Sequence, residues 1–197
     1  MVSFIIPSGR VYSTLAAHLY SGKGFGDPLT VTFEMDDWDG IAWVMAVYPE
    51  QEYFVATRLS RGMRIMGEHL IANTRKGKQV IGINPDDNLL TITPVRGDSV
   101  ASIDSDGRML ISPLISYPLL PRGKGVRIQR LLRAGSLVDV TVIDTADGVI
   151  LDSGKRKRHV TDLDPWLSHR ASRGVDLPFG FKRGGRFAVA SDDGSTS

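Results

Sequence analysis

Four pairs of a basic residue followed by glycine recur along the chain at nearly constant spacing. The pairs are Lys23-Gly24, Lys76-Gly77, Lys124-Gly125 and Arg173-Gly174, and their glycines lie 53, 48 and 49 residues apart. A cation neutralises phosphate charge, and glycine lacks the Cβ that would keep a phosphate away from backbone N–H groups. Further cations flank the pairs: Arg75, Lys78, Arg122, Arg127 and Arg170. The pattern predicts repeated stations that bind a polyanion through its phosphates.

A second cationic feature is the uninterrupted run Lys155, Arg156, Lys157 and Arg158. Side chains alternate between the two faces of a strand, so Lys155 and Lys157 would share one face and Arg156 and Arg158 the other. One of these faces is then a candidate anion-binding surface. The alternative interpretation is a solvated edge strand whose charges prevent aggregation.

No arrangement typical of a catalytic or metal site stands out. The chain has no cysteine, and its four histidines are not spaced as metal ligands. Residues 22–26 lack the spacing of a nucleotide-binding phosphate loop, and the acidic residues 36–39 lack the full ligand pattern of a calcium loop. We therefore expect no catalytic residue, no metal and no cofactor in this chain.

The same period appears in the turns. Turns of the form Ser-Gly-basic, or a looser version, are centred on Gly9, Gly62, Gly107 and Gly154, which lie 53, 45 and 47 residues apart. Glycine tolerates the positive φ that tight hairpins need. Short runs rich in Val, Ile, Tyr and Phe surround the turns, and two further strand-like runs follow in each period, residues 28–33 among them. Four short strands in about 45–50 residues are typical of a propeller blade.

The sequence thus predicts an all-β propeller or pinwheel of about four repeats over residues 1–190. The repeats are roughly 1–24, 25–77, 78–125 and 126–174, with closing strands in 175–190. Residues 2–14 and 175–190 each supply half a blade in this scheme, so we expect an array that is open or lacks its first blade. Alternatively, the two halves pair and close a ring. The polar residues 191–197 predict a disordered tail.

The charge is unevenly distributed although the net charge is only +2. Residues 1–60 carry −4, residues 61–150 carry +3 and residues 151–197 carry +3. A polyanion would therefore be attracted most strongly to the later segments. The longest apolar runs are too short to span a bilayer, and the N-terminus does not resemble a signal peptide.

Several segments together are similar to one known domain. Residues 21–29, the Gly107–Leu110 stretch followed by residues 122–125, and residues 154–157 with 173–181 carry the similarity. On these segments the chain resembles the C-terminal β-propeller, or pinwheel, domain of the A subunits of bacterial gyrase and topoisomerase IV, with more likeness to topoisomerase IV of proteobacteria. It departs from that family in lacking a first blade and the Gln-Arg-Arg-Gly-Gly-Lys-Gly box of gyrase.

The resemblance implies a non-catalytic domain that binds and bends double-stranded DNA without sequence preference, helping to capture the transported DNA segment. It implies the rest of the A subunit and the ATPase B subunit as partners, and a place at the nucleoid in the bacterial cytoplasm. The catalytic tyrosine of such enzymes lies outside this sequence, so we expect a piece of a longer protein or a reading frame started late. Two alternatives stay open: a protein-interaction propeller that does not bind DNA, favoured by the acidic first third, and a propeller enzyme.

Overall fold

The computed structural model of the chain describes residues 1–19, 26–35, 40–182 and 184–188, and its regular structure is almost entirely β-strand. The strands of the N-terminal half are β1 (Val2–Ile5), β2 (Arg10–Thr14), β3 (Trp43–Ala46), β4 (Glu52–Thr57), β5 (Arg61–Met66), β6 (Lys78–Gln79) and β7 (Leu89–Pro94). Those that follow are β8 (Ser99–Asp104), β9 (Arg108–Pro113), β10 (Val126–Arg127), β11 (Leu137–Ile143), β12 (Val149–Asp152), β13 (Lys157–Val160), β14 (Val175–Asp176) and β15 (Arg186–Phe187). The helical elements are α1 (Leu29–Thr32) and the 3-10 helices η1 (Ala16–His18), η2 (Gly67–Leu70), η3 (Leu114–Ser116) and η4 (Asp164–Trp166).

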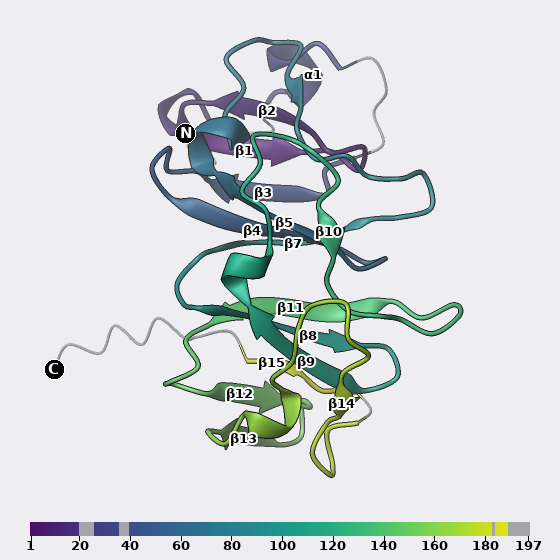
Figure 1. Cartoon of the computed structure of the whole chain (residues 1–197). Helices are drawn as coiled ribbons and strands as arrows, with labels where there is room; N and C mark the ends of the chain where they lie inside the picture. The colour runs from purple at the N-terminus through teal and green to yellow at the C-terminus, as the bar shows by residue number, and fades with distance from the viewer. Residues whose placement is uncertain (20–25, 36–39, 183, 189–197) are drawn as a thin grey trace, which may run out of the picture.

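The strands form antiparallel sheets, which we call blades 1 to 4 (Figure 1). The strand orders are β3-β1-β2-β6, β10-β5-β4-β7, β11-β8-β9-β14 and, within the described residues, β13-β12-β15. Each blade is built around one hairpin, and a later strand pairs back with the first strand of that hairpin. In blades 1–3 the second hairpin strand also pairs with a two-residue strand that the chain reaches only after the next hairpin. Successive blades are therefore interlocked.

The propeller-like all-β fold predicted from the sequence is confirmed, and the array is open. Figure 1 shows blades 1 and 4 at opposite ends of the molecule. The prediction that residues 2–14 and 175–190 each form half a blade is wrong. Strands β3 and β6 complete the sheet around the first hairpin, and β14 and β15 join blades 3 and 4. The alternative of a closed ring is also wrong, since β15 pairs with β12 and not with the N-terminal hairpin. The predicted repeats are continuous stretches of sequence, whereas each of blades 1–3 is assembled from strands that belong to several successive repeats.

Each hairpin turn contains a residue with positive φ. These residues are Gly9 (83°), Ser60 (70°), Gly107 (75°) and Gly154 (77°). The prediction of Gly62 as the second turn residue is therefore wrong by two positions; Gly62 lies inside β5, where a Cβ would meet the Phe54 ring at 2.8 Å. The Ser60 hydroxyl donates to the carbonyl of Gln129 and accepts its N–H, both at 2.8 Å. These two bonds hold a non-glycine residue in the left-handed conformation.

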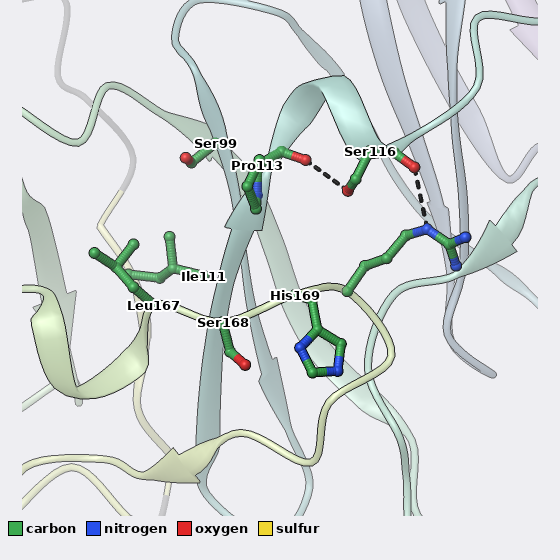
Figure 2. Close-up of a pocket in the computed structure, with 8 residues that line it drawn as sticks. Ser99, Ile111, Pro113, Ser116, Leu167, Ser168 and His169 are labelled. Atoms are coloured by element: carbon green, nitrogen blue, oxygen red, sulfur yellow. Dashed lines mark hydrogen bonds between the residues drawn. The ribbon is translucent and has the colours of Figure 1, made fainter.

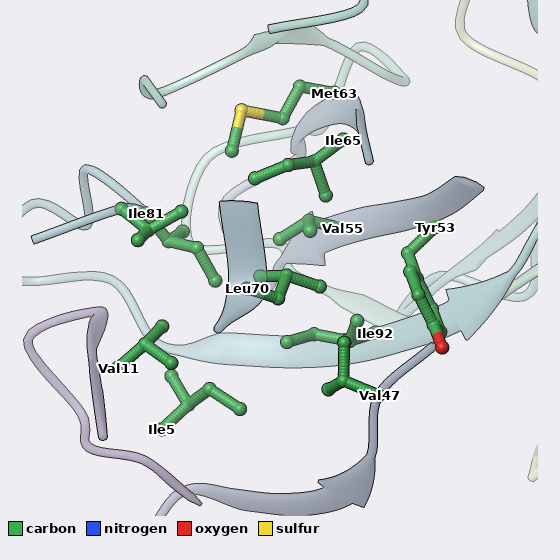
Figure 3. Packing of buried hydrophobic residues seen from close by; sticks show 11 residues of the cluster. Ile5, Val11, Val47, Tyr53, Val55, Met63, Ile65, Leu70, Ile81 and Ile92 are labelled. Atoms are coloured by element: carbon green, nitrogen blue, oxygen red, sulfur yellow. The ribbon is translucent and has the colours of Figure 1, made fainter. Parts of the chain in front are cut away.

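Hydrophobic clusters fill the spaces between successive blades. Figure 3 shows the cluster between blades 1 and 2, where Ile5 of the first hairpin and Val55 of the second are buried. Phe54 and Tyr117 pack edge to face between blades 2 and 3, with ring centroids 4.9 Å apart. Leu151 belongs to the third cluster, between blades 3 and 4. Since each cluster takes residues from two blades, no blade buries its apolar face alone.

Residues 28–35, which we call the strap, cover the outer face of blade 1. The predicted strand at residues 28–33 is wrong: after Pro28 the chain forms α1. Phe33 is buried against Phe4 and Tyr12, with ring centroids 5.8 and 5.3 Å apart. Among the described residues no further blade covers this face, and the helical turn places Phe33 over the aromatic side chains of Phe4 and Tyr12.

The proline-containing connectors after the hairpins of blades 3 and 4 form the single 3-10 turns η3 and η4. Among the described residues no helix is both long and apolar enough to cross a membrane.

Candidate nucleic-acid interface

Three basic–Gly pairs occupy equivalent positions in the fold. Lys76-Gly77 leads into β6, Lys124-Gly125 into β10 and Arg173-Gly174 into β14. Their glycines have φ of 62°, 70° and 77°, and a Cβ on any of them would overlap with a backbone carbonyl of the neighbouring hairpin strand. The close approach of two strands thus requires glycine here, which gives it a packing role; the predicted phosphate approach stays a prediction. Lys23-Gly24 lies outside the described residues.

The pairs lie along one edge of the array. Strands β6, β10 and β14 are the edge strands of blades 1–3, on the opposite side of each sheet from β3, β7 and β11. On that opposite side the sheets converge, because β11 contacts both β7 and β15. The basic–Gly pairs therefore lie on the other, outer edge, as the prediction of matched stations on a curved scaffold requires.

Backbone hydrogen bonds join the outer-edge segments to one another. The N–H of Gly82 donates to the carbonyl of Gly123 at 2.8 Å, and the N–H of Gly123 donates to the carbonyl of Val80 at 2.9 Å. Further along, the N–H of Arg130 donates to the carbonyl of Ser172 at 2.9 Å. The segment that leaves one blade edge thus runs beside the segment that enters the next, and the cations on these segments lie in a band along this edge.

Four of the predicted cations on this band are exposed and weakly engaged. Lys76 has 81% of its side chain exposed, and its Nζ lies 4.0 Å from a Glu34 carboxylate oxygen. The Nζ of Lys124 donates to the Asn84 side-chain oxygen at 2.9 Å. Arg122 and Arg127 are exposed and form no ion pair with a described residue. Their charges are available to an external anion.

Arg61 and Arg127 face each other directly across the β5–β10 pair of blade 2. Both are exposed, and neither guanidinium has an acidic partner among the described residues. Like charges directly opposite on neighbouring strands are destabilising. The equivalent positions avoid this repulsion: Arg10 faces Gln79 in blade 1, and Arg108 faces Asp176 in blade 3, with an N–O distance of 3.4 Å. At these two positions blade 2 thus holds two cations without a counter-charge. Blade 1 holds a single cation there, and blade 3 holds an oppositely charged pair.

Sequence reasoning missed Arg61, because the second turn was placed two residues too late and the equivalence with Arg10 and Arg108 was hidden. It also missed Arg130, an exposed residue whose position beside Ser172 depends on the tertiary contact described above. We call the exposed cations of this edge the basic rim: Arg61, Lys76, Arg122, Lys124, Arg127 and Arg130.

Arg173, the predicted site residue in blade 3, is held within the protein. Its guanidinium pairs with Asp104, which is 1% exposed, and with Asp106 at 2.7 Å. Partial desolvation lowers the pKa of Arg173, but the hydrogen bonds and attraction from the two carboxylates outweigh it and raise the pKa overall. The charge is balanced locally, so we leave Arg173 out of the basic rim.

Three other predicted cations also make internal contacts. Arg75 donates to the carbonyls of Val31 and Thr32 at the end of α1. Arg170 donates from Nε to the carbonyl of Ser116 at 3.1 Å. Desolvation lowers the pKa of Lys78, and the attraction of a nearby glutamate only partly offsets it. These residues fix the rim segments in place and are less available to an external anion.

The cationic run of residues 155–158 spans the turn of the blade 4 hairpin and the first half of its second strand, β13. Lys157 and Arg158 lie in β13, whose neighbour among the described strands is β12, and Lys155 and Arg156 lie in the turn. All four are exposed, and Lys157 lies 3.7 Å from Asp152. The placement is compatible with both interpretations given above, an edge strand protected by charge and an anion-binding surface.

An open array of interlocked antiparallel blades, each built on one hairpin, with cations along the outer edge, defines the protein as a β-pinwheel. No protein-family model matches the chain. Among solved structures, the E. coli ParC C-terminal domain superposes with a TM-score of 0.80 and 23% identity, covering 93% of this chain and 78% of that one. A DNA gyrase A C-terminal domain gives a TM-score of 0.65 at 15% identity, over 88% of this chain and 58% of that one.

The chain's homologues are A subunits of DNA topoisomerase IV, as the sequence resemblance implied. The subunit of Rickettsia bellii is 26% identical over 95% of this chain and 25% of its own length. That of Caulobacter vibrioides is 31% identical over 91% of this chain and 24% of its own length. The chain thus spans about a quarter of the relatives it matches, and the matched part is their non-catalytic C-terminal domain.

Proposed function

We propose that this chain binds duplex DNA along its basic rim without reading the base sequence. The observation that carries the proposal is the Arg61–Arg127 pair, two exposed guanidinium groups held opposite each other with no internal counter-charge. A phosphate between them would remove a repulsion that the free protein tolerates. Arg122 and Lys124 on the same outer edge extend the contact along a phosphate backbone.

A duplex bound along the rim would also be bent. The sheets of blades 2–4 converge at one edge, and the rim lies at the other edge, from Lys76 at blade 1 to Arg130 beside the segment that enters blade 3, so a duplex that follows the rim would take a curved path. Bending a site of 20–30 base pairs by 40–90° costs roughly 1–6 kcal/mol in elastic estimates. One phosphate contact does not offset this, whereas contacts repeated from blade to blade do.

In the longer protein we assign the domain an accessory role. As part of a type IIA topoisomerase A subunit, it would hold and bend the DNA segment presented for transport, in support of decatenation and supercoil relaxation. Its partners would be the rest of the A subunit and, through it, the ATPase B subunit, at the nucleoid in the bacterial cytoplasm. This chain itself would need no cofactor, since its task is electrostatic.

Titration of a labelled duplex with the chain at several salt concentrations tests the proposal. Each neutralised phosphate contributes about −0.9 to the slope of log K against log salt. Contact with three or more rim cations gives a slope of about −3 or steeper, and a slope near zero excludes DNA binding by this surface.

Charge reversal separates DNA binding from a protein-interaction role. Lys76→Glu with Lys124→Glu places two acids on the rim, and we expect it to abolish retention of the duplex in a gel-shift assay. Arg96→Glu is the control for a charge reversal away from the rim, because Arg96 is exposed and lines the same hollow as Thr141 of β11 on the converging side. Equal retention by the two variants would favour the protein-interaction alternative.

A further inference from the structure

The outer edge of blade 4 lacks the strand that completes the other blades. In blades 1–3 the second hairpin strand pairs on its outer side with β6, β10 or β14. The corresponding strand of blade 4 is β13, whose one sheet neighbour among the described residues is β12. Three of the four residues of β13 are exposed, whereas β9 buries four of its six. A position that the fold fills in three blades is thus open in the fourth.

The backbone of β13 presents both a donor and an acceptor on this edge. The N–H of Ser153 donates to the carbonyl of Arg156 at 3.0 Å and closes the hairpin. Because the bonding direction alternates along an antiparallel strand, the N–H and carbonyl of Lys157 point away from β12. A peptide strand can pair with both groups, whereas a phosphate backbone offers only acceptors and leaves the carbonyl unpaired. The edge therefore fits an extended polypeptide better than DNA.

The strand that fills this edge in blade 3 follows a defined course. The incoming segment first runs beside the end of β9, where the N–H of Ser168 donates to the carbonyl of Ile111 at 2.9 Å (Figure 2). It then accepts, through the carbonyl of Ser172, the N–H of Arg130 from the segment that leaves blade 2. Beyond Gly174 it pairs with β9 as β14. An incoming segment thus contacts the hairpin strand of its own blade and the exit segment of the blade before.

The exit segment of blade 3 is free at the corresponding point. Phe179 lies three residues beyond the outer strand, as Arg130 does in blade 2, and its N–H has no partner in the part of the chain that the structure describes. Its side chain is 94% exposed. The next residue, Gly180, lies beside the hairpin of blade 4, since a Cβ on it would be 3.3 Å from Nη1 of Arg156. The two surfaces that an incoming segment would contact are therefore adjacent and open.

The charge at this edge is opposite in sign to that of blade 3. Asp106 in the turn of blade 3 binds Arg173 of the incoming segment, with an N–O distance of 2.7 Å. The turn of blade 4 carries Lys155 in place of this acid, and three more cations follow it. The one acid in residues 149–160 is Asp152, which lies 3.7 Å from Lys157. An incoming segment for blade 4 would thus be favoured by an acid where blade 3 uses Arg173.

A second acid is favoured opposite Arg156. This residue accepts the bond that closes its hairpin, as Arg10 does in blade 1. Arg108 takes the same place in blade 3, where it lies 3.4 Å from Asp176 of the incoming strand. Arg156 forms no ion pair with a described residue. A carboxylate at the position of Asp176 would supply the missing counter-charge.

Blade 4 also exposes an apolar residue where the added strand would end. In blades 1–3 the residue after the outer strand is apolar, is buried and belongs to the cluster that its blade shares with the next: Val80, Ile128 and Leu177. On blade 4, Leu151 faces blade 3, so the neighbouring Ile150 lies on the opposite face. Ile150 is 47% exposed. An apolar side chain that follows the added strand would cover it.

We propose that the outer edge of blade 4 binds a segment of a partner protein by strand addition. The segment has the order acid, glycine, any residue, acid, apolar residue. Its glycine approaches β13 as Gly174 approaches β9, where a Cβ would be 2.7 Å from the Met109 carbonyl oxygen. The first acid meets Lys155, the second faces Arg156, and the apolar side chain covers Ile150. The site is separate from the basic rim and independent of the proposed DNA binding.

The test measures the anisotropy of a fluorescently labelled peptide, ASEGVDLP, titrated with the full chain. This peptide is residues 171–178 with Arg173→Glu. We expect saturable binding. In the protein, Lys157→Pro removes the outward N–H and should abolish binding, while the sheet tolerates proline because this N–H is not used within it. Lys157→Ala is the matched control, which keeps the N–H and should weaken binding several-fold at most; urea unfolding checks that both variants fold.

A charge exchange tests the facing residues. Arg156→Glu should weaken binding of ASEGVDLP several-fold, and a peptide with Lys in place of its Asp, ASEGVKLP, should recover affinity on this variant. Arg96→Glu, a charge reversal at an exposed residue elsewhere, should leave the affinity unchanged. The peptide ASEAVDLP, in which alanine replaces the glycine, should not bind, because its Cβ would meet the hairpin strand.

Five outcomes would overturn the proposal. Three concern the peptide: no saturable binding at millimolar concentration, equal affinity for the Lys157→Pro and Lys157→Ala variants, or equal binding of ASEAVDLP and ASEGVDLP. A concentration-dependent dimer in sedimentation that Lys157→Pro abolishes would assign the edge to a second copy. Loss of duplex binding in Arg156→Glu without any peptide binding would assign the cationic run to DNA. Lys76→Glu with Lys124→Glu should leave peptide binding unchanged, so failure of this site and failure of the basic rim can be told apart.

Discussion

Replacing Arg127 with glutamine should weaken DNA binding and at the same time stabilise the fold. The substitution removes one of the two guanidinium groups that face each other across β5 and β10. It copies blade 1, where Gln79 faces Arg10 and donates to the carbonyls of Ser8 and Ile81, at 2.7 and 2.9 Å. A glutamine therefore fits this edge position without disturbing the strand pairing.

Both effects can be estimated. Loss of one phosphate contact should make the slope of log K against log salt less negative by about 0.9, which corresponds to about eightfold weaker binding at 0.1 M salt. Loss of the like-charge pair should raise the free energy of unfolding by roughly 0.2–1 kcal/mol, the usual range for a cross-strand pair. The opposite signs distinguish a functional cation from a residue that merely supports the fold.

Anisotropy of a labelled duplex of about 30 base pairs, recorded at four or more salt concentrations, measures the first effect, and urea unfolding measures the second. Arg96→Gln on the converging side is the control and should change neither slope nor affinity appreciably. An unchanged slope for Arg127→Gln would refute the assignment of Arg127 to the DNA surface. Lower stability would refute the argument from charge repulsion.

Three further substitutions test the scaffold and its pH dependence. Gly125→Ala should destabilise by about 2 kcal/mol or more in urea unfolding, because φ is positive and the Cβ overlaps with the neighbouring strand. Arg173→Ala should cost about 3 kcal/mol by leaving the buried Asp104 carboxylate unpaired, while the salt slope of DNA binding changes little. Burial raises the pKa of Asp139, and the N–H of Phe187, which donates to its carboxylate, opposes the shift only in part. Since a raised folded pKa favours the protonated form, stability from this group is present in acid and lost as the pH rises. Asp139→Asn should therefore be more stable than the parent above the ordinary carboxyl pKa of 3.8 and show no gain below it, and a gain independent of pH would contradict this.

The repeated architecture was predictable because its signals are local. Turn residues such as Gly9, Gly107 and Gly154, and the apolar runs around them, reflect φ preferences and strand burial that act over a few residues. The second turn was misplaced because Ser60 adopts the glycine-like conformation, stabilised by bonds to Gln129 far along the chain. A long-range contact of this kind leaves no pattern in the local sequence.

Tertiary contacts decide which strands make up each blade and which cations stay exposed, so neither could be predicted from the sequence. Strands β6, β10 and β14 are two residues long, too short for periodicity to reveal which hairpin they join. Arg173 has the same local sequence pattern as Lys124, yet Asp104 and Asp106 neutralise it in the fold. Sequence spacing thus located the cations of the outer edge, and only the structure separated exposed charges from paired ones.

The interlocked strands impose an order on assembly. Blade 1 gains its last strand only after the chain has passed through the hairpin of blade 2, and the same holds for each of the next two blades. During synthesis a sheet therefore stays unfinished until its successor has emerged, and completion advances in one direction from the N-terminus. Loss of one hairpin would accordingly open the preceding sheet as well, so that neighbouring blades should melt together rather than one by one.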